Sequence, residues 1–181
     1  LNNEGSETIS KRLSGEDFGK LRVGINAANS NLTPEFILED SIADYLKTMK
    51  LFKDVGDYYD VNISCPNTKD GRSFVSDHVL LSELIREIKK VLLKTKLSVK
   101  IPPDAQNPLG LTKNVIESGA DILVVSNTFP AMSIDPITKK SRLSAGYGGL
   151  SGPGTHPIVV RLVNVLYKEI TRSTDTPIIA L

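Results

Sequence analysis

Five short runs of apolar and β-branched residues recur along the chain, separated by longer stretches of mixed polarity. Because they are almost continuously apolar rather than alternating, they are typical of strands covered on both faces, as in parallel sheets. The predicted strands are "LRVGI" (Leu21–Ile25), "YDVNIS" (Tyr59–Ser64), "LSVKI" (Leu97–Ile101), "DILVVS" (Asp121–Ser126) and "PIIAL" (Pro177–Leu181).

The stretches between these runs carry the periodicity of helices. Asp77 is expected to cap a helix in which Leu81, Ile85, Ile88 and Leu92 form one apolar stripe. Three further helices are predicted: Glu35–Leu51 after Thr33-Pro34, Leu109–Ser118 before Gly119, and a helix after Pro157 with Ile158, Leu162, Leu166 and Ile170 at every fourth position.

Strands that alternate with helices indicate βα units with right-handed crossovers. Two architectures fit this order: a doubly wound sheet and a (β/α)₈ barrel. A barrel takes about 250 residues, so five strands would be most of one, with units missing at both ends. Residues 129–155 are too long for an ordinary connection, which predicts a lid or a ligand-binding loop.

Composition excludes several classes of function. The 181 residues are 40% hydrophobic and 24% charged, with a formal net charge of +1, which gives no strong field for nucleic acid or an anionic membrane. No apolar run approaches the roughly 18–20 residues of a membrane span, and no secretory signal opens the sequence. The single cysteine cannot form an internal disulfide, so a reducing, cytoplasmic setting is expected.

Hydrogen-bonding residues, most of them uncharged, follow or end four of the predicted strands. Ligands of both candidate architectures bind at the carboxyl ends of parallel strands, so these side chains are expected to meet there. Asparagines offer donors and an acceptor, which suits a flat ligand with alternating C=O and N–H groups, such as a pyrimidine or an isoalloxazine. The residues are Asn26, Asn62, Cys65, Asn67, Lys100, Ser126, Asn127 and Thr128.

Each of these residues also has a structural interpretation. A lone cysteine after a strand is commonly an inert, small apolar residue, and asparagines commonly satisfy turn backbone. Lys100 is harder to explain in this way, because a buried ammonium without a partner is costly. Neither a metal-ligand cluster nor a phosphate-binding motif such as GxGxxG comes after a strand. The Gly-rich stretch 146–154 is a weak signal by itself.

Four motifs in a fixed order give the chain a family resemblance. "VNISCPNT", "SVKIPPD", "VVSNT" and "GGLSG", together with "LNNEG" and "VGINAANSN", resemble the dihydroorotate dehydrogenase family. The resemblance implies an α/β fold, a (β/α)₈ TIM barrel that is incomplete at both ends here, with residues 1–181 as the central part of a single FMN-binding domain. It also implies that FMN is the cofactor and that dihydroorotate is oxidised to orotate.

The resemblance assigns a role to individual positions. Cys65 is expected to be the base that takes a proton from C5 of dihydroorotate while C6 gives hydride to N5 of FMN. No metal site is expected. Substrate contacts are expected from Asn2, Asn62, Asn67, Asn127 and Thr128, and FMN contacts from Asn26, Asn62, Lys100, Ser126 and Gly152.

The motifs conflict on the electron acceptor. Cysteine as the base resembles the soluble class, which uses fumarate or, through a partner subunit, NAD. The contexts "LNNEG", "GINAANSN" and "DYYDVNIS" look more like the quinone-using class, which is peripheral on a membrane such as the mitochondrial inner membrane. The electron acceptor therefore stays open between fumarate, NAD and a quinone. A homodimer is one possible assembly of the protein, and no nucleic-acid partner is expected.

Two rival interpretations remain. The "YGGLSG" segment is also similar to the pyrimidine-reducing barrel of dihydropyrimidine dehydrogenase, although that branch has histidine where this chain has Asn67. The other is a truncated, non-catalytic barrel that serves as a binding module.

Overall fold

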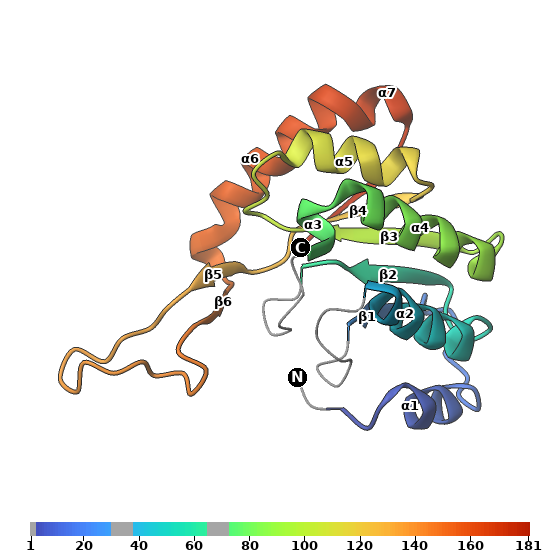
Figure 1. Ribbon diagram of the computed structural model, residues 1–181, viewed down its shortest axis with the longest axis horizontal. Helices are drawn as coiled ribbons and strands as arrows, with labels where there is room; N and C mark the ends of the chain where they lie inside the picture. The colour runs from blue at the N-terminus through green and yellow to red at the C-terminus, as the bar shows by residue number, and fades with distance from the viewer. Residues whose placement is uncertain (1–2, 30–37, 65–72) are drawn as a thin grey trace.

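The structure, a computed structural model, describes residues 3–29, 38–64 and 73–181. Its main sheet has five parallel strands in the order β1-β2-β3-β4-β7, so the strands of this sheet lie side by side in the order in which they occur along the chain (Figure 1). The strands are β1 (Gly24–Ala28), β2 (Tyr58–Asn62), β3 (Lys96–Ile101), β4 (Ile122–Val125) and β7 (Ile178–Ala180).

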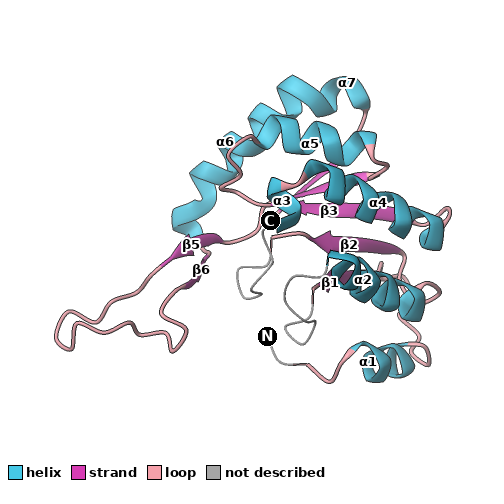
Figure 2. Cartoon of the chain, in the orientation of Figure 1, coloured by secondary structure: helices cyan, strands magenta, loops and turns pink. Residues whose placement is uncertain are grey.

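The helices succeed one another around one side of this sheet. Contacts link α1 with α2, α2 with α4, α4 with α5, and α5 with α6, so neighbouring helices pack in series (Figure 2). The helices are α1 (Ser6–Leu13), α2 (Leu38–Phe52), α3 (Ser73–Ser76), α4 (His78–Leu92), α5 (Pro108–Glu117), α6 (His156–Leu166) and α7 (Arg172–Thr174), with a 3₁₀ turn η1 (Pro153–Thr155) and a π turn η2 (Tyr167–Thr171).

This arrangement decides between the two predicted architectures. A doubly wound sheet carries helices on both faces and reverses its strand order at a switch point. Sequential strands with all neighbouring helices on one side are instead the geometry of part of a (β/α)₈ barrel. The prediction of an incomplete TIM barrel is confirmed.

The two faces of the sheet differ in their surroundings. Along β1, Ile25 and Ala27 are buried against the helices, whereas Gly24, Asn26 and Ala28 are exposed on the other face. The expectation that every strand is covered on both faces is therefore wrong for β1. The described helices cover the outer face, and the opposite face is the one a barrel would enclose.

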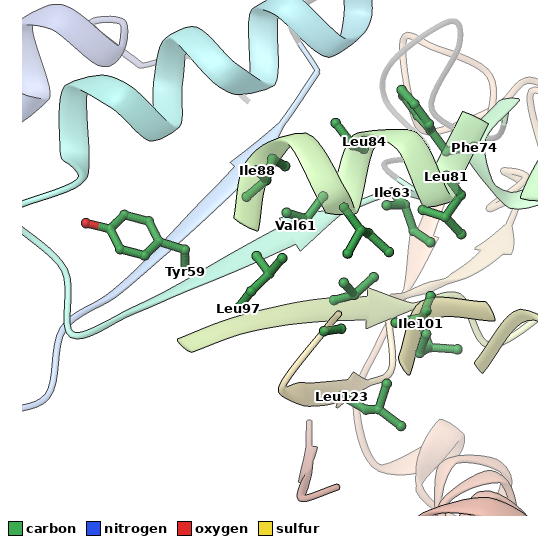
Figure 3. Packing of buried hydrophobic residues seen from close by; sticks show 14 of the residues in the cluster. Tyr59, Val61, Ile63, Phe74, Leu81, Leu84, Ile88, Leu97, Ile101 and Leu123 are labelled. Carbon is green, nitrogen blue, oxygen red and sulfur yellow. The ribbon is translucent and has the colours of Figure 1, made fainter. Parts of the chain in front are cut away.

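The hydrophobic core lies between the sheet and α4. Val61 of β2 and Leu97 of β3 lie beneath Leu84 and Ile88 of the helix, and Leu123 lies further along the sheet on β4 (Figure 3). All five side chains are fully buried. Burying one such side chain contributes about 1.5–3 kcal/mol. This packing fixes the strands in register and so positions the polar residues at their carboxyl ends.

The predicted helix ends are largely confirmed. Asp77 caps α4 by accepting hydrogen bonds from the backbone N–H groups of Val79 and Leu80, both at 3.0 Å. Asn107 caps α5, and Gly119 comes just after that helix with a φ of +114°, a value that L side chains rarely adopt. The predicted start of α2, at Thr33-Pro34, lies outside the described residues.

The first strand begins three residues later than predicted. Asp57 receives hydrogen bonds from the Arg22 guanidinium at 2.7 Å and the Val23 N–H at 2.8 Å, which holds this segment at the entrance to the sheet. Leu21 is 74% exposed, so its apolar character did not indicate burial.

Residues 129–155 form an arm rather than an irregular loop. Strand β5 (Phe129–Ala131) pairs with β6 (Gly148–Leu150) in an antiparallel ladder, and an isolated bridge joins Ile134 to Ser141 further out. The arm extends away from the sheet (Figure 1). The long connection predicted from the sequence is thus a hairpin, and its predicted role as a lid stays a prediction.

The packing of α4 predicts that Leu84→Ala lowers the free energy of unfolding by about 2–5 kcal/mol, because it leaves a cavity in a fully buried position. Urea denaturation of the folded protein would measure this. Val79→Ala on the same helix is the matched control, since Val79 is 80% exposed, and it should change stability by less than about 0.5 kcal/mol. Equal losses in both variants would contradict the described packing.

Candidate functional site

Two rows of side chains cross the uncovered face of the sheet near the carboxyl ends of the strands. Strand pairing aligns Ala28 with Asn62, Asn62 with Lys100, and Lys100 with Val124. Paired residues on parallel strands project to the same face. The row nearer the carboxyl ends of the strands therefore places Asn62 and Lys100 side by side, between Ala28 and Val124.

The ends of three strands are tied together by Asn127, which lies just after β4. Its backbone N–H donates to the carbonyl of Ile101 at 3.2 Å. Its side-chain Nδ2 lies 2.9 Å from Oδ1 of Asn62 and 3.0 Å from both the carbonyl and the hydroxyl of Ser64. Its own Oδ1 accepts from the Thr128 N–H at 2.9 Å. Asn127, predicted to contact substrate, thus has an extensive structural role.

These bonds fix the direction in which Asn62 offers its amide. Its Oδ1 accepts from Asn127 and, at 3.3 Å, from the Ser64 N–H, while its backbone carbonyl accepts from the Tyr45 hydroxyl at 2.8 Å. Within the described part of the chain, its Nδ2 has no hydrogen-bond partner. Asn62 can therefore present two N–H donors to a ligand.

Lys100 is half-buried beside Asn62. Its ammonium has no carboxylate within 4.0 Å among the described residues, so its charge is available on this face. Its influence reaches Asp60, where burial raises the carboxyl pKa and Lys100 opposes that rise together with hydrogen bonds from Ser98 and Asn26. The expectation that Lys100 faces a ligand or an anion is compatible with this position.

Three other predicted site residues lie in different surroundings. Asn26 lies on the same face as Asn62 but two positions deeper, and its amide is bound to Asp60. Ser126 is buried, and its hydroxyl donates to the carbonyl of Asn127 at 3.0 Å. Gly152 directly precedes η1 with a φ of +108° and has no neighbour within 4 Å of an added Cβ.

Thr128 packs against the Gly-rich stretch at the base of the arm. A Cβ added to Gly149 would come within 2.1 Å of the Thr128 Oγ1, so only glycine fits beside this side chain. The close backbone approach that glycine permits at this stretch is therefore made to Thr128 of the chain itself. The predicted residues Asn2, Cys65 and Asn67 lie outside the described residues.

Sequence reasoning missed three polar residues that build this face. Asp60, Ser64 and Ser98 were not singled out, although Asp60, Asn62 and Ser64 are spaced by two, as are Ser98 and Lys100. A period of two within an apolar strand places residues on one face. That spacing was the signal that could have identified them.

A cavity of about 320 Å³ lies next to the site and shares Ser64 with it. It is lined by the start of α4 and the segment after β3, including His78, Asp104 and Gln106. In the described part of the chain, no cluster of His, Cys, Asp or Glu could hold a metal ion. Over the same residues, no helix is both long and apolar enough to cross a bilayer.

The fold defines the chain as part of a (β/α)₈ barrel, a class of protein in which ligands bind at the carboxyl ends of the strands, where this polar face lies. The family model for dihydroorotate dehydrogenase matches residues 1–181. The chain therefore belongs to the dihydroorotate dehydrogenase family, and the resemblance inferred from its motifs is confirmed.

Two curated relatives illustrate the match. The chain is 39% identical over 126 residues to the catalytic subunit of dihydroorotate dehydrogenase B (NAD(+)) of Petrotoga mobilis, covering 69% of this chain and 40% of the relative. It is 37% identical over 141 residues to a protein of Solibacter usitatus named as a candidate dihydroorotate dehydrogenase A (fumarate), covering 76% and 45%. The chain thus spans less than half the length of either relative.

The fold has a counterpart among solved structures. The crystal structure of DHODH from Eimeria tenella in complex with ferulenol superposes with a TM-score of 0.70 at 23% identity, covering 97% of this chain and 50% of that one. At this identity the likeness establishes the fold alone.

The bonds of Asn127 predict that Asn127→Ala destabilises the protein by about 1–3 kcal/mol, because Asn62 and Ser64 lose a buried donor. Chemical denaturation measures the loss. Asn164→Ala on α6 is the matched control, since its side chain is exposed and should tolerate the change. A stability for Asn127→Ala equal to that of the control would show that the bridge contributes nothing.

Proposed function

We propose that the protein oxidises dihydroorotate to orotate with FMN as the hydride acceptor, in pyrimidine biosynthesis. The observation that carries the proposal is the row in which Asn62 and Lys100 present adjacent donors, without partners among the described residues, on the face that a barrel encloses. The family match over residues 1–181 supports the same activity.

The donor set fits a flavin. Lys100 and the Nδ2 of Asn62 supply N–H donors and a positive charge, which suit the N1–C2=O edge of an isoalloxazine and the negative charge it carries when reduced. Ala28 and Ile179 belong to the same row and are exposed, so they offer apolar surface to a flat ring. When bound, FMN supplies a hydride acceptor at N5.

Cys65 is proposed as the base. Oxidation removes hydride from C6 of dihydroorotate and a proton from C5, leaving a C5=C6 double bond, and the thiolate of Cys65 takes the proton. An unperturbed thiol has a pKa of about 8.5. A nearby cation favours the reactive thiolate, and Lys100 is proposed to supply that charge. The preceding residue, Ser64, is anchored at the strand ends by Asn127.

The remaining predicted contacts are assigned in the same way. Asn2, Asn67 and Thr128 are proposed to bind substrate with Asn62 and Asn127, whereas Asn26, Ser126 and Gly152 are proposed to contact FMN. Because Asn127 already bonds to Ser64 and Asn62, its proposed role is to hold these two residues in place as well as to contact substrate.

The electron acceptor is proposed to be fumarate or, through a partner subunit, NAD. Relatives named for each of these acceptors support both, and cysteine at position 65 agrees with them. A quinone acceptor stays a prediction from the sequence motifs alone, as do the homodimer and the cytoplasmic location.

The proposed activity predicts that the full-length natural protein is purified yellow and is bleached by dihydroorotate under anaerobic conditions. Absorbance in the flavin band measures this, with dithionite as the control for complete reduction. Bleaching by NADPH instead would favour the dihydropyrimidine dehydrogenase type of reaction. A colourless, well-folded full-length protein would favour a non-catalytic binding module.

The proposed base predicts that Cys65→Ala slows flavin reduction by dihydroorotate about 10²–10⁴-fold at neutral pH, because proton removal loses its acceptor. Stopped-flow absorbance would give the rate. Flavin content and reduction by dithionite should match the wild-type protein, which separates lost chemistry from lost cofactor. A wild-type rate in Cys65→Ala would exclude this residue as the base.

A further inference from the structure

Asp60 is a buried carboxylate at the centre of the uncovered face of the sheet. Only 6% of its surface is exposed. Strand pairing places it between Asn26 on β1 and Ser98 on β3, in the row directly below Asn62 and Lys100. A charged group in such a position is costly unless it is hydrogen-bonded or paired.

Both oxygens of this carboxylate are engaged. Oδ1 accepts from the Ser98 hydroxyl at 2.7 Å, and that hydroxyl also lies 3.2 Å from the carbonyl of Tyr59. Oδ2 accepts from Nδ2 of Asn26. The carboxylate is therefore held in one orientation by donors from the two neighbouring strands.

The bond to Asn26 sets the polarity of that amide. A carboxylate can only accept hydrogen bonds when ionised, so it selects the Nδ2 side of the Asn26 amide. The Oδ1 of Asn26 then points away from Asp60. Asn26, which is exposed on this face, thus offers an acceptor to a ligand, in contrast to the donors of Asn62 and Lys100.

The charge of Lys100 also acts on Asp60. They lie on adjacent strands, with Lys100 paired to Asn62, two residues beyond Asp60. Burial raises the pKa of the Asp60 carboxyl, while Ser98, Asn26 and the charge of Lys100 lower it. From β3 the charged group that acts on Asp60 is Lys100, and β1 contributes Asn26, which does not titrate.

We propose that Asp60 is a positioning residue that orients the Asn26 amide through its carboxylate and offsets part of the positive charge that Lys100 presents to a bound flavin. The inference rests on the proposed function and goes beyond it. It assigns to Asp60, a residue outside the proposed ligand contacts, control of how strongly the bound flavin favours its reduced state. No proton or electron passes through Asp60 in this role.

Asp60→Asn in the full-length holoprotein tests this role. The variant keeps the shape of the side chain and removes its charge, so the reduced, anionic flavin should be bound about tenfold more tightly relative to the oxidised form. For a two-electron couple, tenfold corresponds to about 30 mV. Spectroelectrochemistry at neutral pH should therefore show a higher midpoint potential for FMN.

Ser98→Ala provides a second variant that retains the carboxylate. Loss of the 2.7 Å hydrogen bond removes one of the groups that lower the pKa of Asp60, so the carboxylate protonates at a higher pH. Its potential should approach that of the wild type as the pH rises and exceed it as the pH falls, because a protonated Asp60 no longer offsets Lys100. This variant keeps the test decisive if Asp60→Asn fails to fold.

Asp121→Asn is the matched control. Asp121 is a partly buried carboxylate that binds Lys89 at 2.7 Å and Lys96 at 3.1 Å, but it lies before β4, at the opposite end of the strands. Its substitution should reduce stability without moving the potential. The wild type could bind flavin while Asp60→Asn and Ser98→Ala both show the wild-type midpoint potential at every pH. That result would overturn this inference and leave the proposed function standing. A colourless wild type would overturn the proposed function together with this inference.

Discussion

One asparagine, through its backbone and its side chain, holds the carboxyl ends of three strands together. Asn127 reaches from the end of β4 across β3, where its backbone bonds to Ile101, to Asn62 and Ser64 at the end of β2. Strand pairing alone stops at the last ladder bond, so the segments beyond it need such side-chain bonds to keep a defined position. The site depends on this bridge because Asn62 and the residue before Cys65 are both bonded to it.

The bridge also divides donors from acceptors on the enclosed face. Since Asn127 uses the oxygen of Asn62, the nitrogen of Asn62 is left to face a ligand beside Lys100. In the row below, Asp60 uses the nitrogen of Asn26, so the oxygen of Asn26 is left. Two asparagines that look alike in sequence are thereby given opposite polarity, which is what recognition of an asymmetric ring requires.

The parts of the fold that could be predicted from sequence are those fixed by short-range physics. The stripe from Leu81 to Leu92 and the cap at Asp77 are consequences of helical periodicity and of unpaired N–H groups at a helix start, and both were found. The start of β1 and the strand pairing within the arm were not predicted, because they depend on hydrogen bonds between residues far apart in the sequence. Arg22 and Val23 bond to Asp57, and β5 pairs with β6 at the base of the arm.

The sequence by itself determined the order of strands and helices, the family, and the residue types gathered at the strand ends, because these depend on local periodicity and on motifs that each lie within a few residues. Only the tertiary structure decided that the helices share one face and that Asp60 supports Asn26. It also decided which atom of each amide is left for a ligand. Hydrogen-bond direction depends on partners tens of residues away, and these meet only once the strands are aligned in register.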